Sequence, residues 1–377
     1  MRGRTPWLGL CTDRPLPKAL MDLFSAAQLG ALPLSNRLVM APLTRVRAEA
    51  DGTPTPLIAE HYAQRATLGL IITEGTFTSQ EAKGFAGQPG IVTDEHESGW
   101  ARVATAVHDH GGLIAMQLMH AGRVSHTDIN GTARIVGPSA IAIDGEARTS
   151  EGKAAYETPE ALTAEELPLV IEEFVTAAQR AIRAGIDAVQ LHVANGYLLH
   201  EFLSPASNTR TDAYGGSPEN RVRFVVEVVA AVVAAVGADR TGIRISPERN
   251  IQGVAETDPA DVATTYGLLA DAIAPMNLAF VDIMHPDPAG ALVQDIRARI
   301  GAPVIVNTSF ASPSTREESL ALAEADVADA IAIGRAAIAN PDVVERWRTG
   351  AAENEADPST FYGSGARGYT DYPRLSA

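Results

Sequence analysis

Three polar residues stand close together at the end of an apolar segment, and their types suit chemistry on a carbonyl group. His192 ends the segment Ala188–His192, and Asn195 and Tyr197 follow it. An imidazole N–H and a carboxamide N–H three residues apart can converge on one acceptor, such as an oxygen that gains negative charge during reaction. Tyr197 adds a phenol whose reference pKa of about 10 keeps it protonated at neutral pH, ready to donate. A second interpretation stays open, in which the histidine is a satisfied strand end, Asn195-Gly196 forms a turn and the tyrosine packs in the core.

These side chains need a scaffold, and the chain repeats a pattern that provides one. Short runs rich in Val, Ile and Leu recur, each leading into a polar turn and then into a segment of helical periodicity. The expected strands are Leu38–Met40, Leu70–Thr73, Leu113–Gln117, Ala188–His192, Thr241–Ile245, Ala279–Ile283, Val304–Asn307 and Ala330–Ile333. The expected helices are Pro56–Thr67, Gly99–His110, Glu165–Arg183, Glu219–Val236, Asp258–Ile273, Leu292–Ile300, Thr315–Ala325 and Asp342–Thr349. Thr163 and Glu166 predict a capping box at the third helix.

Eight such units predict an α/β fold, a single (β/α)8 TIM barrel. Alternating apolar strands and helices require a parallel sheet covered by helices, and eight units close into a barrel. An open doubly wound sheet would also explain the alternation, but no G-x-G-x-x-G motif follows the first strand. The functional groups of a barrel lie just after the carboxyl ends of its strands, and His192 stands at such a place.

Two long segments and the N-terminus lie outside the repeating unit. Thr127–Glu157, between the third and fourth strands, contains several Gly, Pro, Ser and Thr residues and predicts a lid or hairpin insertion over the barrel mouth. Ser204–Pro218 follows the fourth strand and is expected to be functional. We expect residues 1–20 to be a disordered extension and residues 21–377 to form one domain, the barrel with a C-terminal tail.

The composition narrows the range of partners and compartments. The 377 residues carry a formal net charge of −16, which repels phosphate backbones and anionic lipids, so nucleic acids and membranes are poor candidate partners and a small molecule is favoured. The apolar run Val228–Val236 is about half of the ~18 residues that a membrane span needs. The single cysteine, Cys11, excludes internal disulfides and cysteine-ligated metal centres and suits a reducing compartment, so a cytoplasmic location is expected.

Further motifs accompany the segment around His192. They are Asn36–Arg45 at the first strand, Gln117–Arg123 at the third, Arg244–Pro247 at the fifth, Ile333–Arg335 with Ala339–Asp342 at the eighth, and Phe361–Gly363 with Gly368–Pro373 in the tail. Together with His192–Arg221 they resemble the Old Yellow Enzyme family of FMN-dependent ene-reductases. The resemblance runs from about residue 22 to residue 373. It implies an NAD(P)H-dependent flavin oxidoreductase with FMN as cofactor and NADPH or NADH as hydride donor.

The resemblance assigns several residues to the flavin. Thr44 would place a hydroxyl at the flavin C4 carbonyl, and Gln117 would offer an amide to the pyrimidine edge. Arg244 would set a positive charge near flavin N1 and O2, which stabilises the anionic reduced ring. Arg335 and the backbone amides around Gly334 would bind the phosphate. The other flavin-binding residues that the resemblance implies are Pro42, Gly75 and Ser309.

The same resemblance implies the reaction. His192 and Asn195 would bind the carbonyl or nitro oxygen of an activated alkene, the flavin N5 hydride would enter at the β-carbon, and Tyr197 would protonate the α-carbon from the opposite face. The implied substrate-pocket residues are Met119, Phe85 and Tyr362. The expected partner is thus a small-molecule activated alkene, bound by a monomer or a homodimer.

At three places the chain departs from the family pattern. Met119 stands where many members carry tryptophan and others alanine, which alters the pocket beside the substrate. Asn307-Thr308-Ser309-Phe310 replaces a segment that commonly contains glycine, so a Cβ must be accommodated near the phosphate. Phe85 stands where relatives often carry tyrosine and removes one hydroxyl from the rim.

Other interpretations remain at this stage. A metal-dependent hydrolase would draw nitrogen ligands from His110, His120, His126, His192 and His200. It lacks the H-x-H pair that would end the first strand, where Thr44 is the one possible ligand, and we expect no metal. A non-catalytic binding barrel would not need the three polar residues after the fourth strand. Arg244 could also have a structural role, paired with a carboxylate inside the barrel.

Overall fold

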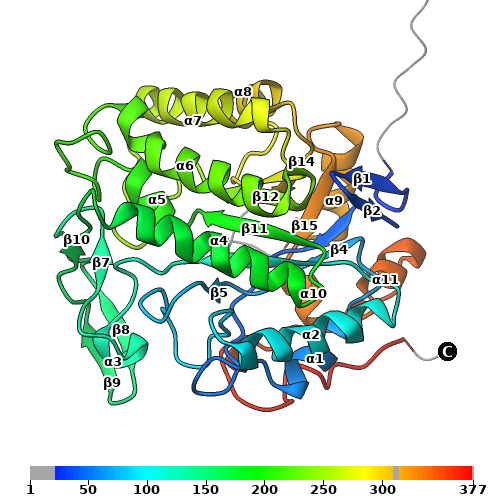
Figure 1. Cartoon of the computed structure of the whole chain (residues 1–377). Coiled ribbons are helices and arrows are strands. Elements are labelled where there is room, and N and C mark those ends of the chain that lie inside the picture. Colours follow the sequence, from blue (N-terminus) through cyan, green and yellow to red (C-terminus); the bar gives the residue numbers. More distant parts are fainter. Residues whose placement is uncertain (1–21, 309–313, 376–377) are drawn as a thin grey trace, which may run out of the picture.

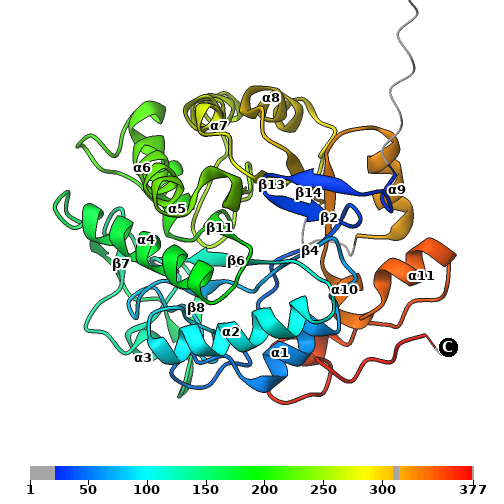
Figure 2. The ribbon, with the colours of Figure 1, turned by 45° about the vertical axis from the view of Figure 1, so that its right-hand side comes forward.

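The computed structural model describes residues 22–308 and 314–375, and within them eight parallel strands close into a barrel surrounded by helices (Figures 1 and 2). In order around the barrel the strands are β3 (Leu38–Met40), β4 (Leu70–Ile72), β6 (Ile114–Met119), β11 (Ala188–Val193), β12 (Thr241–Ile245), β13 (Phe280–Met284), β14 (Val304–Asn307) and β15 (Ala330–Ile333). β15 pairs in parallel with β3, and β6 pairs with β11, so the sheet has no break. The predicted (β/α)8 barrel is confirmed.

The helices pack their apolar stripes against the outside of the strands. The longer ones are α1 (Pro56–Ala63), α2 (Asp94–His108), α4 (Leu167–Arg183), α6 (Pro218–Val236), α7 (Pro259–Ile273), α8 (Ala291–Ile300) and α9 (Arg316–Glu324). α3 (Thr127–Asn130), α5 (Leu198–Leu203), α10 (Arg335–Ala339) and α11 (Val343–Thr349) are shorter. In α4 the buried residues Val170, Phe174, Ala177 and Ala181 recur at helical spacing on one face. No helix among the described residues has the length and apolarity needed to span a bilayer.

Several helix boundaries differ from the sequence prediction; α1, for example, ends at Ala63 and not at Thr67. α2 begins at Asp94, five residues before the predicted Gly99, because the Thr93 side chain accepts a hydrogen bond from the His96 N–H and caps the helix. The predicted third helix begins at Leu167, not Glu165, although Thr163 N–H donates to the Glu166 carboxylate at 2.8 Å as a capping box requires. Local caps therefore move helix ends without changing the order of the elements.

A hairpin that sequence analysis did not predict closes the amino-terminal end of the barrel. β1 (Ala27–Leu29) and β2 (Leu32–Leu34) pair antiparallel, and Ala31 N–H donates to Asp239 C=O just before β12. Their leucines are part of an apolar cluster inside the barrel. This cluster contains Leu29, Leu32, Leu34, Val39, Leu70, Ile72, Ala115, Ala188, Ala279, Phe280, Ile305, Ala330 and Ala332. The hairpin is the floor of the barrel.

The insertion after β6 lies at the opposite end of the molecule from the floor hairpin (Figure 1). Within it β7 (Val136–Gly137) pairs with β10 (Glu160–Ala161), and β8 (Glu146–Thr149) pairs antiparallel with β9 (Gly152–Ala155). The predicted hairpin is therefore present. The short strand β5 (Thr76–Phe77) pairs with the end of β6. Residues 1–20, predicted to be an extension, lie outside the described residues.

Candidate active site

A cavity of about 390 Å³ opens at the carboxyl ends of the strands. Its lining residues are Pro42, Leu43, Thr44, Gln117, Met119, His192, Asn195, Tyr197, Arg244, Arg249, Ile251, Gln252, Arg335, Ile338, Phe361 and Tyr362. The strand ends and the loops that follow them supply these residues, as the barrel architecture requires. Ten of the residues that sequence analysis singled out are thus brought together around one space, although they span the chain from the first strand to the tail.

Of the four remaining predicted residues, the structure describes three, and they lie beside this space. Phe85 lines an adjoining hollow of about 460 Å³, which shares Thr44, Tyr197 and Tyr362 with the first cavity. A Cβ on Gly75 would lie 2.7 Å from the Met119 sulfur, so glycine lets the methionine occupy the cavity wall. Gly334 precedes Arg335 at the start of α10. Ser309 lies outside the described residues.

A chain of buried polar side chains crosses the barrel beneath the cavity. Gln117 Nε2 donates to Gln190 Oε1 at 2.7 Å, and Gln190 Nε2 donates to the Asp282 carboxylate at 3.1 Å. Arg244 Nη1 lies 3.5 Å from the same carboxylate. The strand register makes this possible, because Gln117 is level with Gln190 and Arg244 is level with Asp282 on neighbouring strands. Burial raises the pKa of Asp282, and the Arg244 charge opposes that rise.

The structural alternative for Arg244 is therefore partly realised, but pairing does not use the whole guanidinium. Arg244 Nε is buried and has no hydrogen-bond partner among the described residues, although the side chain lines the cavity. An unsatisfied buried donor costs about 1–3 kcal/mol. A buried cation that keeps a free donor toward a cavity is suited to an anionic or acceptor-rich ligand.

His192 is held in its neutral form. It is 4% exposed, and burial followed by the nearby Arg244 charge holds the pKa of its imidazole well below the ordinary value. Its Nδ1 atom and the Asn195 Oδ1 atom find no hydrogen-bond partner among the described residues, although both side chains line the cavity. A neutral imidazole keeps one N–H to donate, so these two side chains can receive a polar group of a ligand together.

Tyr197 stands beside them with its phenol protonated. Its ring centroid lies 5.1 Å from that of His192, and the side chain is 8% exposed. Burial raises the pKa of Tyr197 to about 12. Gln252, which sequence analysis did not single out, hydrogen-bonds the tyrosine and donates from Nε2 to the Asn195 C=O at 2.6 Å. The phenol can therefore act as a proton donor at neutral pH.

The C-terminal tail reaches the cavity because two buried arginines hold it. Arg45 Nη2 donates to Gly368 C=O at 2.7 Å, and Arg47 Nη2 donates to Thr360 C=O at 2.8 Å. Both guanidinium groups lie over the Tyr369 ring, at 5.0 Å and 4.4 Å from its centroid. The neighbouring Phe361 and Tyr362 line the cavity as a result, and Tyr362 is 67% exposed at the mouth.

Some residues at the site carried a sequence signal that was not used. Gln190 and Asp282 are polar residues inside apolar strands, and such residues must find partners inside the barrel. Ile251 and Gln252 carried no such signal, because loop conformation alone brings them to the cavity.

Three of the five histidines of the metal-hydrolase alternative have separate partners for a ring nitrogen. Gly122 N–H donates to His120 Nδ1, Gly196 N–H donates to His200 Nδ1, and His110 lies at 2.9 Å from Ala106 C=O. Among the described residues, no three His, Cys, Asp or Glu side chains are placed to hold a metal ion together.

Known proteins are similar to this chain over almost its whole length. A model of the NADH:flavin oxidoreductase / NADH oxidase family matches residues 22–354. The chain is 42% identical to a probable flavin mononucleotide-dependent alkene reductase of Leishmania infantum, over 94% of this chain and 98% of the relative. This chain belongs to the Old Yellow Enzyme family.

Solved structures of the Old Yellow Enzyme family superpose closely on the barrel. A homologue from Zymomonas mobilis has a TM-score of 0.88 at 39% identity and covers 94% of this chain and 99% of its own. Morphinone reductase in complex with tetrahydroNAD has a TM-score of 0.88 at 43% identity, with 94% and 98% covered. The protein is therefore a flavin oxidoreductase of the alkene reductase type.

The residues around the cavity fit the FMN on which this Old Yellow Enzyme family depends. The isoalloxazine ring needs hydrogen-bond partners along its pyrimidine edge and a cation near N1, and Gln117 and Arg244 line the cavity with a free donor on the arginine. The phosphate needs a cation, and Arg335 lines the same space after β15. The donor set thus matches an electron-rich, anionic cofactor.

Proposed function

We propose that this protein reduces activated alkenes, α,β-unsaturated carbonyl or nitro compounds, with electrons from NADPH or NADH. The observation that carries the proposal is the meeting of a protonated phenol with two polar side chains, each of which has a buried atom without a partner among the described residues. His192, Asn195 and Tyr197 line one cavity, and burial together with the Arg244 charge favours the neutral imidazole of His192 by lowering its pKa. An oxygen that gains negative charge beside a carbon that must accept a proton needs this combination.

Thr44, Gln117, Arg244 and Arg335 would hold FMN in the cavity that they line. When bound, FMN would supply the redox chemistry, accepting a hydride from the reduced nicotinamide and passing it to an alkene carbon. Arg244 would stabilise the negative charge of the reduced ring, and its partner Asp282 would fix the orientation of the guanidinium.

His192 and Asn195 would donate hydrogen bonds to the substrate oxygen. The depressed pKa of His192 keeps the imidazole neutral, so it would bind a neutral carbonyl without trapping the enolate as a tight ion pair. A preorganised donor of this kind contributes about 3–4 kcal/mol to the stability of an oxyanion. The backbone of Asn195 is held on both sides, because its N–H donates to Ser246 Oγ and its C=O accepts from Gln252 Nε2.

Tyr197 would protonate the α-carbon as the enolate collapses. The raised pKa keeps the phenol as the proton donor across the physiological range. Its edge-on neighbour Phe85, at 6.4 Å between ring centroids, would exclude water from one side of the phenol. The phenol then regains its proton from solvent at the mouth.

The proposal is tested with the purified protein loaded with FMN. We expect a yellow protein that develops long-wavelength absorbance with p-hydroxybenzaldehyde and oxidises NADPH or NADH under nitrogen only when 2-cyclohexen-1-one is added. Cyclohexanone should accumulate in proportion to the nicotinamide oxidised. A loaded protein that consumes NADPH and NADH with oxygen but leaves the enone intact would refute the substrate assignment.

A further inference from the structure

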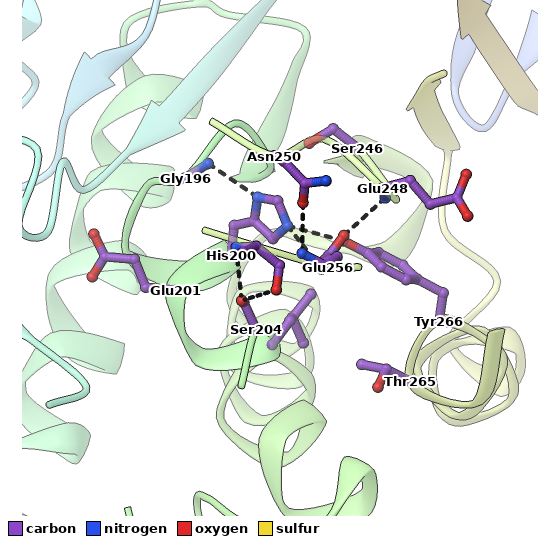
Figure 3. Close-up of polar contacts among 12 residues, drawn as sticks. Gly196, His200, Glu201, Ser204, Ser246, Glu248, Asn250, Glu256, Thr265 and Tyr266 are labelled. Carbon is purple, nitrogen blue, oxygen red and sulfur yellow. Dashed lines mark hydrogen bonds and ion pairs between the residues drawn. The ribbon is translucent and has the colours of Figure 1, made fainter. Parts of the chain in front are cut away.

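A buried polar cluster, drawn in Figure 3, contributes no residue to the lining of the cavity. It consists of His200 on α5, Glu256 in the loop after β12 and Tyr266 on α7, which are 0%, 7% and 1% exposed. His200 Nε2 lies 3.0 Å from Glu256 Oε1, and the Tyr266 hydroxyl donates to the same oxygen at 3.0 Å. Three titratable side chains are thus buried together although they do not line the cavity. Such side chains are rarely buried unless they pair with one another.

The backbone contacts of the cluster fix its protonation pattern. Gly196 N–H donates to His200 Nδ1 at 3.0 Å, so Nδ1 carries the lone pair and the ring proton is on Nε2, facing Glu256. Glu248 N–H donates to the other carboxylate oxygen of Glu256 at 2.8 Å. The Tyr266 hydroxyl also lies 3.1 Å from His200 Nε2, so all three side chains contact one another, and the cluster joins the backbone at Gly196 to the backbone at Glu248.

Those two backbone points belong to the two segments that carry the proposed chemistry. Gly196 lies between Asn195 and Tyr197, and Glu248 begins the loop that brings Gln252 to the cavity. Asn195, Glu248 and Gln252 are three of the six described non-glycine residues with positive φ, at 58°, 60° and 56°. Such conformations persist only where the surroundings hold them in place.

The two segments also touch each other on the cavity side. Asn195 N–H donates to Ser246 Oγ at 2.9 Å, and Gln252 Nε2 donates to the Asn195 C=O at 2.6 Å. A Cβ on Gly196, whose φ is 82°, would lie 2.7 Å from the Ile251 C=O oxygen. The turn and the loop are therefore closely packed against each other. The cluster adds hydrogen bonds to both segments on the side away from these contacts.

We propose that His200, Glu256 and Tyr266 are positioning residues that hold the Asn195-Gly196-Tyr197 turn and the 248–252 loop in one fixed relation. The turn sets where the donor of Asn195 and the phenol of Tyr197 point, and the loop supplies Gln252 to both of them. This inference rests on the proposed function only for its consequence for ligand binding. The fixed relation of the turn and the loop does not depend on which ligand the protein binds.

The first test measures amide hydrogen exchange by mass spectrometry, with and without FMN. His200→Leu removes both ring contacts, and we expect exchange in peptides covering 194–199 and 246–254 to accelerate about tenfold or more. His96→Leu is the matched control. His96 is also buried, its Nδ1 also accepts a backbone N–H, from Val92, and its Nε2 also contacts an oxygen, that of Asp51. In this control the two segments should exchange as in the wild type.

Two conservative variants separate the halves of the cluster. In His200→Asn the amide oxygen takes the place of Nδ1, so protection of the 194–199 peptide should return while the 246–254 peptide stays fast. In His200→Gln the amide nitrogen takes the place of Nε2, and the pattern should reverse. Equal protection of both peptides in His200→Asn, His200→Gln and wild type would overturn the proposal, and this comparison holds even where His200→Leu does not fold.

The second test asks what the relation of the two segments does for a ligand. In FMN-loaded protein we expect His200→Leu to raise the Kd of p-hydroxybenzaldehyde, followed by its long-wavelength absorbance, about tenfold, and His96→Leu to leave it within about twofold. Tyr266→Phe, which keeps the His200–Glu256 contact, should fall between them. An unchanged Kd in His200→Leu contradicts the consequence for binding. A wild-type protein that binds no phenol contradicts the proposed function instead, and the exchange result still decides the positioning claim.

Discussion

At the amino-terminal end of the barrel, Leu29, Leu32 and Leu34 of the floor hairpin pack on an interior made almost entirely of apolar side chains. At the carboxyl end, the same strands carry a buried chain from Gln117 to Arg244 and several polar atoms without partners among the described residues. Fully burying a leucine contributes about 1.5–3 kcal/mol, whereas an unsatisfied buried polar atom costs about 1–3 kcal/mol. The same strands therefore stabilise the folded protein at the floor and destabilise it in part at the mouth.

The difference shows how this barrel separates stability from chemistry. Polar atoms left free at the mouth are available to a cofactor and a substrate, and their cost is tolerable because the floor is tightly packed. Variants at the floor should change the free energy of unfolding without changing turnover, and variants at the mouth should do the reverse.

The largest effect on stability is expected at the floor. Leu29→Ala removes a side chain that is 0% exposed, and the cavity left behind should lower the free energy of unfolding by about 2–5 kcal/mol. Urea denaturation measures this loss. The rate of enone reduction at a temperature where the variant stays folded should remain within about twofold of wild type, and a larger fall would mean that the two ends are not independent.

The largest effect on turnover is expected at Tyr197. Tyr197→Phe keeps the ring and removes the acidic proton, so the reoxidation of the reduced enzyme by 2-cyclohexen-1-one should slow ~10²-fold or more, about 2.7 kcal/mol. Stopped-flow measurement of each half-reaction separates this step from reduction by the nicotinamide, which should stay nearly unchanged. Equal slowing of both half-reactions would argue against the phenol as proton donor.

Acid should lower the free energy of unfolding through a buried histidine at the carboxyl end of the barrel. Burial lowers the pKa of His120, directly after β6, to about 3, whereas the unfolded chain binds this proton near pH 6.5. Stability from this group is present above pH 6.5 and is lost as the pH falls toward 3, by about 1.4 kcal/mol per pH unit and about 2 kcal/mol at pH 5.

His120→Asn tests this linkage, because an amide oxygen can still accept the Gly122 N–H. Urea titrations between pH 5 and pH 8 should give a pH dependence of unfolding that is shallower by about one proton in the variant. Parallel curves for the two proteins would show that His120 takes no part in the acid sensitivity.

The smallest effect is expected at the rim of the mouth. Phe85→Tyr restores the hydroxyl that many members of the family carry, but this hydroxyl can be solvated in the outer hollow. We expect kcat/KM for 2-cyclohexen-1-one to change by less than about threefold and the stability by less than about 0.5 kcal/mol. A tenfold change in kcat/KM would show that residues of the outer hollow, and not only those of the cavity, control turnover.

Sequence reasoning reached the barrel and most of its functional end. A strand can be predicted from its own apolar run and a helix from its own periodicity. Ala188–Val193 and Leu167–Arg183 could therefore be located within a few residues. The start of α2 was placed too late because the cap at Thr93, followed by Asp94, Glu95 and Glu97, was overlooked. The floor hairpin is absent from the prediction because its strands, with the sequences AQL and LPL, lack the uninterrupted apolar runs that mark the barrel strands.

The site divides in the same way. His192, Asn195 and Tyr197 are neighbours in the chain, so their meeting could be predicted from spacing alone. Gln190 and Asp282 meet only across strands, 92 residues apart, and the register that aligns them is a property of the closed sheet.

By itself the sequence determined which residue types occur at the strand ends and that eight apolar runs alternate with helices, because both are local properties of the chain. Only the tertiary structure decided which buried polar groups find partners and which stay free toward the cavity. It also decided how the 248–252 loop is held, since Glu256, which accepts the Glu248 N–H, meets His200 of α5 and Tyr266 of α7 only in the folded barrel.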